Sequence, residues 1–154
     1  MMTEINTTAG SIWKSKRPEF DNVELPNDIT LLNSEQLGEK FTKLTAWADY
    51  AASELAHAQI AEREAQRILS LKENTLLVAK LGSGVKGERV TYVKAQIAID
   101  PEVLDLSQEY ENRYAYRKLV EMTLSNYERD LALVSRELTR RSNDLRSTRK
   151  EWSL

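Results

Sequence analysis

Apolar and polar residues alternate along most of the chain with the three- and four-residue spacing of α-helices. From residue 34 to residue 81 one heptad register comprises Phe41, Leu44, Ala48, Ala51, Leu55, Ala58, Ala65, Leu69, Leu76 and Ala79. Glu62 and Lys72 are the only charged breaks in this seam. One of its two positions is mostly alanine, and small residues let a partner helix approach closely. The pattern predicts a long helix with a coiled-coil-like face.

Capping signals bound this first helix at about residues 34–81. Asn33 or Ser34 can cap its start, and Gln36 stands where a capping box requires a glutamine. Gly82 follows the last seam residues, and glycine readily takes the left-handed conformation that ends a helix.

A second helix is expected over about residues 101–152. Asp100-Pro101-Glu102 supplies an N-cap acid, a proline in the first turn and an acid beside the helix dipole. Its seam comprises Val103, Leu106, Tyr110, Val120, Leu124, Tyr127, Leu131, Val134, Leu138, Leu145 and Trp152. Between the helices lies a basic loop, 82–99, of which 89–99 fits either a strand or a short helix, with helix preferred.

Residues 1–33 show no helical period and contain Gly10, Pro18 and Pro26. They are expected to form an extended or disordered N-terminal arm before a helical domain at 34–154. One interpretation is a disordered tail. The other is an arm that docks Trp13 and Phe20 on a neighbouring subunit.

Two helices of matching length with a short connection favour an antiparallel helical hairpin. Because two helices alone leave apolar flanks open, we expect an all-α homo-oligomer. The residues expected at the oligomer interface are Ala51, Ala58, Ala65, Leu124, Leu131, Leu138 and Trp13.

The amino-acid composition limits the classes of protein to which the chain can belong. The 154 residues are 41% hydrophobic and 30% charged, which excludes a disordered chain. No signal peptide is recognisable, and no apolar run reaches the roughly 20 residues that span a membrane. We therefore expect a soluble protein of the cytoplasm (the host cytoplasm if the chain is viral) that has no membrane partner.

Little in the sequence indicates catalysis, so a non-enzymatic protein without cofactor or metal is expected. The glycine-rich stretch 82–87 has the wrong order and spacing for a phosphate-binding loop, and a helix precedes it. The chain has no cysteine and one histidine, His57. Glu54 and His57 match the Glu-x-x-His pattern of helical metal sites once, and the second helix offers no matching pair.

Basic side chains gather in two places and are the candidate DNA-binding residues. Residues 80–94 carry a net charge of +3 and residues 131–150 a net charge of +4. Such groups bind nucleic-acid phosphates by releasing counterions, and nearby tyrosines could stack on bases. The alternative is ordinary solvation and compensation of the helix dipole. The candidates are Lys80, Lys86, Arg89, Lys94, Arg136, Arg140, Arg141 and Arg146.

Roughly residues 45–140 resemble the UvsY recombination mediators of T-even and related phages. Leu77-Val78-Ala79-Lys80-Leu81 resembles their leucine–basic–alanine–basic–leucine motif, with Val78 in place of the first basic residue. Asp100, Val103, Leu104 and Leu106 resemble the start of the family's second half. The resemblance implies a ring-like homo-oligomer that binds single-stranded DNA, helps displace a single-strand-binding protein and loads a recombinase.

Three hypotheses follow. The leading one is a phage recombination mediator that binds single-stranded DNA. The alternative is a coiled-coil structural or assembly protein, such as a scaffold or chaperone, without DNA binding. A third is a small phage protein that inhibits a host factor through the acidic arm.

Overall fold

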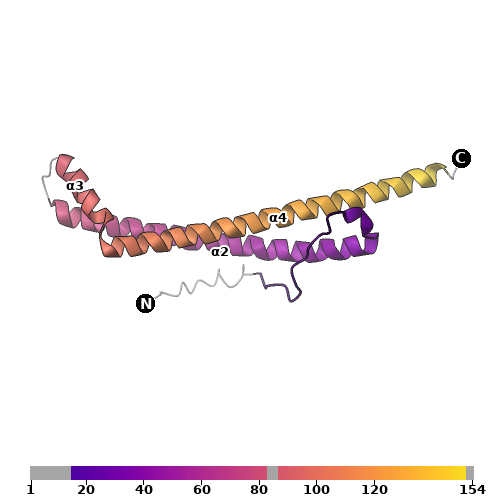
Figure 1. Ribbon diagram of the computed structural model, residues 1–154, viewed down its shortest axis with the longest axis horizontal. Helices are drawn as coiled ribbons and strands as arrows, with labels where there is room; N and C mark the ends of the chain where they lie inside the picture. The colour runs from indigo at the N-terminus through magenta and orange to yellow at the C-terminus, as the bar shows by residue number, and fades with distance from the viewer. Residues whose placement is uncertain (1–14, 83–86, 152–154) are drawn as a thin grey trace. The chain divides into compact units, whose positions relative to one another are not determined.

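The computed structural model describes residues 15–82 and 87–151, and among these residues it contains helices and no strands (Figure 1). A short 3-10 helix, η1 (Ile29–Leu31), precedes three α-helices. These are α2 (Ser34–Leu81), α3 (Gly87–Ala98) and α4 (Pro101–Glu151). The prediction of an all-α chain is confirmed.

The start of α2 forms the predicted capping box. The side-chain oxygen of Asn33 accepts a hydrogen bond from the Gln36 backbone N–H at 2.8 Å. The Gln36 side-chain oxygen in turn accepts from the Asn33 N–H at 2.9 Å. Two backbone donors that a helix start leaves without partners are thereby satisfied.

Glycine ends α2, and an aspartate starts α4. Gly82 has φ of 57°, the left-handed conformation that the sequence predicts for it. Asp100 Oδ1 accepts from the backbone N–H of Glu102 at 3.0 Å and of Val103 at 3.4 Å. The stretch 89–99, which fitted either a strand or a helix, is helical as far as Ala98, within α3.

The chain divides into two compact units, and both long helices contribute to each. The first unit comprises Met1–Glu54 and Glu121–Leu154, and the second comprises Leu55–Val120. Each unit has its own buried cluster.

In the first unit the N-terminal part of α2 packs against the C-terminal part of α4. Trp47 lies at the centre of this cluster, stacked on Tyr127 with ring centroids 6.4 Å apart. Leu37, Leu44 and Val134 are fully buried around it. Residues later in α4 contact residues earlier in α2: Arg141 contacts Ser34, whereas Tyr127 contacts Trp47.

The described part of the arm lies on the helices of its own chain (Figure 1). Val23, Leu25, Ile29 and Leu32 pack against the first cluster. The Trp47 indole N–H donates to the Asp21 carbonyl at 3.3 Å, and the Lys40 ammonium donates to the Glu24 carbonyl at 2.9 Å. Residues 15–33 are therefore held by the chain's own helices.

Phe20, which the docking hypothesis places on a neighbouring subunit, contacts its own chain in this structure. The Phe20 ring meets the Trp47 ring of the same chain edge-on, with centroids 6.4 Å apart. An edge-to-face contact is a favourable geometry for two aromatic rings. Trp13, the other residue of that hypothesis, lies outside the described residues.

In the second unit α3 packs on the C-terminal part of α2. Val93 and Ile97 of α3 and Val103 of α4 are buried. Leu69, Leu76, Leu77 and Leu81 of α2 pack against them. Elsewhere in this unit the seam is polar, because Arg117 pairs with Glu62 and Glu102 pairs with Lys72. The two charged breaks in the α2 seam thus meet opposite charges on α4.

Leu44→Ala is expected to lower the free energy of unfolding by about 2–5 kcal/mol, because it leaves a cavity in the first cluster. Leu71→Ala makes the same chemical change at a residue of α2 that is 61% exposed, and it should cost about 0.5 kcal/mol or less. Urea unfolding followed by circular dichroism measures both. Equal losses for the two variants would show that the cluster around Trp47 is not the core.

Candidate functional site

Three of the predicted DNA-binding residues lie in the second unit. Lys80 is in the last turn of α2, and Arg89 and Lys94 are on α3. All three side chains are exposed, and none forms an ion pair with a residue that the structure describes. Their charges are therefore open to an anionic ligand. Lys86, the fourth basic residue of this group, lies outside the described residues.

The packing of α3 fixes which way its side chains face. Val93 and Ile97 turn inward, so residues on the opposite side of the helix face solvent. Arg89 and Tyr92 are three residues apart, so their side chains are neighbours on the helix surface; both are exposed, Tyr92 at 65%. Lys94 lies beside a shallow depression that Glu73 of α2 also lines.

The tyrosines of α4 are placed differently from Tyr92. The guanidinium of Arg117 lies 5.0 Å from the centre of the Tyr114 ring, a cation–π contact. Arg117 is also paired with Glu62, and both of these side chains are largely buried. Arg113 pairs with Glu109 at 2.6 Å. The arginines beside these tyrosines are thus held by acids of the same chain.

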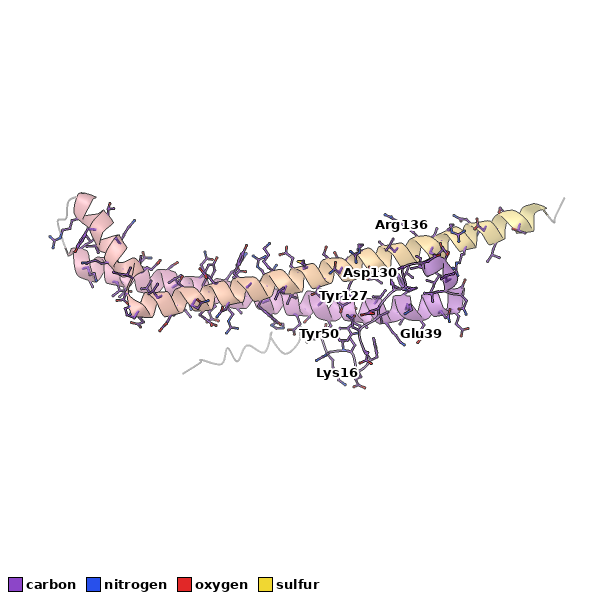
Figure 2. The ribbon with its side chains drawn as sticks, viewed as in Figure 1. Lys16, Glu39, Tyr50, Tyr127, Asp130 and Arg136 are labelled. Atoms are coloured by element: carbon purple, nitrogen blue, oxygen red, sulfur yellow. The ribbon has the colours of Figure 1, made fainter. Side chains whose placement is uncertain are left out.

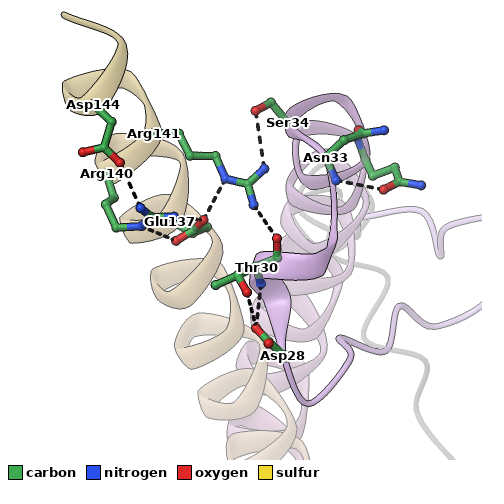
Figure 3. A network of polar contacts seen from close by, with 9 residues as sticks. Asp28, Thr30, Asn33, Ser34, Glu137, Arg140, Arg141 and Asp144 are labelled. Atoms are coloured by element: carbon green, nitrogen blue, oxygen red, sulfur yellow. Dashed lines mark hydrogen bonds and ion pairs between the residues drawn. The ribbon is translucent and has the colours of Figure 1, made fainter. Parts of the chain in front are cut away.

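The second predicted group of basic residues lies on α4 in the first unit, around Glu137 (Figure 3). Arg140 donates two hydrogen bonds to the Glu137 carboxylate, at 2.8 and 2.9 Å, and a third to Asp144 at 2.9 Å. Arg141 donates to Glu137 at 2.7 Å and to the carbonyl of Thr30 in η1 at 3.1 Å. Arg140 and Arg141 are therefore engaged in contacts within the chain.

Among the residues whose burial the structure describes, Glu137 is the only buried acidic side chain, at 7% exposed, although its spacing from Arg141 is typical of a solvated helix face. Hydrogen bonds from Arg140 and Arg141 hold its pKa well below the ordinary value of 4.5, at about 2. The same contact with Glu137 raises the pKa of Arg140. The network ties α4 to the arm just before α2 begins.

The two remaining candidates on α4, Arg136 and Arg146, are exposed (Figure 2 labels Arg136). Neither forms an ion pair with a described residue. The predicted DNA-binding residues therefore separate into three free cations of the second unit and two of the first. Arg140 and Arg141 are bound to acids of their own chain.

Most residues predicted for an oligomer interface are used within one chain. Ala51 and Ala58 are buried, at 5% and 4% exposed. Leu124, Leu131 and Leu138 pack against the first cluster. Ala65 is half-buried, and Trp13 lies outside the described residues. These residues therefore contribute to packing within one chain.

An aromatic cluster under the arm was not foreseen from the sequence. Trp47 contacts Tyr50 edge-on at 6.0 Å, in addition to Phe20 and Tyr127. The Tyr127 hydroxyl donates to the Asn22 side chain at 3.0 Å, and burial raises the pKa of Tyr127. These residues come from three separate segments, and only Trp47 and Tyr50 have a local spacing that could have linked them.

Two further features concern metals and membranes. Within residues 15–82 and 87–151, no three His, Cys, Asp or Glu side chains gather in a way that could hold a metal ion. This includes the surroundings of His57 and Glu54. None of the described helices combines the length and apolarity that crossing a membrane requires.

Comparison with known proteins gives no significant match: no family model matches the chain, and no curated protein or solved structure is significantly similar to it.

The lowered pKa of Glu137 makes a pH-dependent contribution to stability. Folding favours the ionised carboxylate, so the contribution is complete above the ordinary pKa of 4.5 and is lost as the pH falls towards about 2. Glu137→Gln should be less stable than the unaltered chain at pH 7, and the difference should shrink at pH 3. Urea unfolding at both pH values measures this.

Glu128→Gln is the matched control, because Glu128 is an exposed residue of the same helix. It should change stability little at either pH. A Glu137→Gln deficit that is the same at pH 7 and pH 3 would mean that the carboxylate charge does not hold the network together.

Proposed function

We propose that the chain is a non-enzymatic recombination mediator that binds single-stranded DNA as a homo-oligomer and helps a recombinase replace a single-strand-binding protein. The family resemblance of residues 45–140 motivates this proposal. In it, α2 and α4 form an antiparallel hairpin, and the second unit carries the DNA-binding surface. The compartment in which this takes place would be the cytoplasm.

The observation that carries the proposal is the exposed neighbouring pair of Arg89 and Tyr92 on α3. Arg89 offers an unpaired cation to a phosphate, and Tyr92 offers an exposed ring one turn away. Stacking of a base on an aromatic ring is worth about 1–3 kcal/mol and tolerates any base. A cation beside such a ring is the combination that proteins use for single strands of mixed sequence. Lys80 and Lys94 add two further free cations in the same unit.

Exposed surface supports the homo-oligomer. Large apolar side chains are exposed on the described helices, among them Ile60, Leu71, Val78, Ile99, Leu119 and Met122. Further copies of the chain could cover part of this surface.

The same exposed apolar side chains favour a second candidate function, a coiled-coil scaffold or chaperone that assembles without binding DNA. The two functions share the homo-oligomer and differ in the role of α3. The scaffold requires no free cation beside Tyr92, whereas the mediator depends on these groups.

Replacing Lys80, Arg89 and Lys94 together by alanine should weaken binding of a fluorescent oligothymidine at low salt. The slope of log affinity against log salt concentration should become less steep by about 2, because three phosphate contacts are lost at about 0.7 each. Tyr92→Ala should weaken binding and leave the slope unchanged, because it removes stacking and no charge. Fluorescence anisotropy at several salt concentrations measures affinity and slope.

The control removes three cations that are already paired with acids, Lys16, Lys43 and Arg113. It changes net charge by the same amount and should leave the slope nearly unchanged. Equal losses in the two triple variants would mean that diffuse charge, and not α3, binds the DNA. Absence of binding by the unaltered chain at low salt would favour the scaffold.

A further inference from the structure

The charges of α4 are separated along its length. Residues 100–112 contain five acids and no base, and residues 136–151 carry a net charge of +3. Acids at a helix start and bases at its end compensate the helix dipole, but that effect falls off within the first and last turn. Glu109, Glu111 and Arg136 lie several residues beyond those turns. The dipole therefore explains only part of the separation.

The basic end of α4, residues 142–151, carries three bases against two acids and extends past the start of α2 in the first unit (Figure 1). Arg141 reaches Ser34, the first residue of α2, so the residues after Arg141 have no α2 residue opposite them. Leu145 continues the heptad positions of Leu131 and Leu138, which pack against the first cluster. Leu145 itself is 73% exposed. The apolar seam of α4 therefore continues to Leu145, on a helix end that has no α2 residue opposite it.

Arg146 gives this end an available charge. It is exposed and forms no ion pair with a described residue, whereas Asp144 is occupied by Arg140. The basic end thus offers an apolar anchor beside a free cation. A second basic end would be repelled by it, so a pair of such ends is disfavoured.

The second unit carries a surface of opposite charge, the acidic face of α4, formed by Leu104, Asp105, Gln108 and Glu111. Leu104 and Glu111 are seven residues apart and lie on the same side of the helix. Leu104 is 52% exposed. Asp105 and Glu111 form no ion pair with any described residue, whereas the neighbouring Glu102 and Glu109 are paired. This face therefore offers an apolar anchor beside two free acids.

We propose that the basic end of one copy docks on the acidic face of a second copy. The inference rests on the homo-oligomer of the proposed function and names the surface that builds it. Each surface supplies an exposed leucine, and their free charges are opposite. Complementary charges guide the encounter and set its register, while burial of the leucines provides the attraction.

The contact joins two different surfaces, so it is heterologous. Every copy carries one basic end and one acidic face, and the association therefore repeats until it closes into a ring or extends as a filament. Salt screens exposed charges, so assembly should weaken as salt increases.

Charge reversal tests the docking. Arg146→Glu alone and Asp105→Lys with Glu111→Lys should each raise the protein concentration at which half the chains are assembled by tenfold or more. The chain that carries all three substitutions should recover assembly, because the reversed surfaces again attract each other. Sedimentation velocity over a range of concentrations measures the midpoint. Arg63→Glu and Glu128→Lys, at exposed residues outside both surfaces, are the matched controls.

Circular dichroism of each variant verifies that the helices are retained. Recovery in the triple variant supports the docking, because a misfolded chain would not regain assembly from further substitutions. Assembly that is unchanged in the separate variants, or not recovered in the triple variant, overturns it. A monomeric unaltered chain also overturns it.

Failure of the docking is distinguishable from failure of DNA binding. Asp105 and Glu111 are not among the candidate DNA-binding residues, so oligothymidine binding by the Asp105→Lys, Glu111→Lys variant is measured independently of its assembly. Loss of assembly with oligothymidine still bound leaves the DNA-binding proposal intact. Charge-dependent assembly without any oligothymidine binding supports the docking and rejects the DNA-binding proposal.

Discussion

The structure depends on the packing of α2 against α4, because neither helix can bury its seam alone. In the first unit this packing is apolar: Leu44, Trp47 and Val134 are buried, and the arm covers the remaining side of Trp47. In the second unit ion pairs from Glu62 and Lys72 take part in it. The Arg117–Glu62 pair is largely buried, and a buried charge requires an opposite partner, so this pair helps to set the register of the two helices in the second unit. The apolar contacts supply most of the stability.

Features that depend on neighbouring residues could be predicted from the sequence. Three such features are the capping box at Asn33, the left-handed glycine at 82 and the aspartate cap at 100. Each involves groups within about four residues, so a short stretch of sequence is enough to predict it. Long-range contacts were not predictable in this way. Nothing local indicates that Asn22 meets Tyr127 or that Thr30 meets Arg141, because only the folded helices bring these residues together.

The same distinction applies to the candidate sites. Clusters of basic residues are visible in the sequence, but their availability depends on which acids lie near them in space. Glu137 engages Arg140 and Arg141, whereas Arg89 on α3 forms no ion pair with a side chain that the structure describes. The alanine seam is subject to a similar ambiguity. Small residues indicate close helix packing, and a single sequence does not say whether the partner helix belongs to the same chain. Here Ala51 is buried against its own chain.

The central claim is that the chain assembles with itself and presents free cations of the second unit to single-stranded DNA. Light scattering of the full chain, with and without a single-stranded oligonucleotide at low and high salt, tests it most directly. The account predicts a mass of several times 17.7 kDa, a further increase with the oligonucleotide at low salt, and loss of that increase at high salt. A mass of one chain that the oligonucleotide does not change at low salt would contradict it.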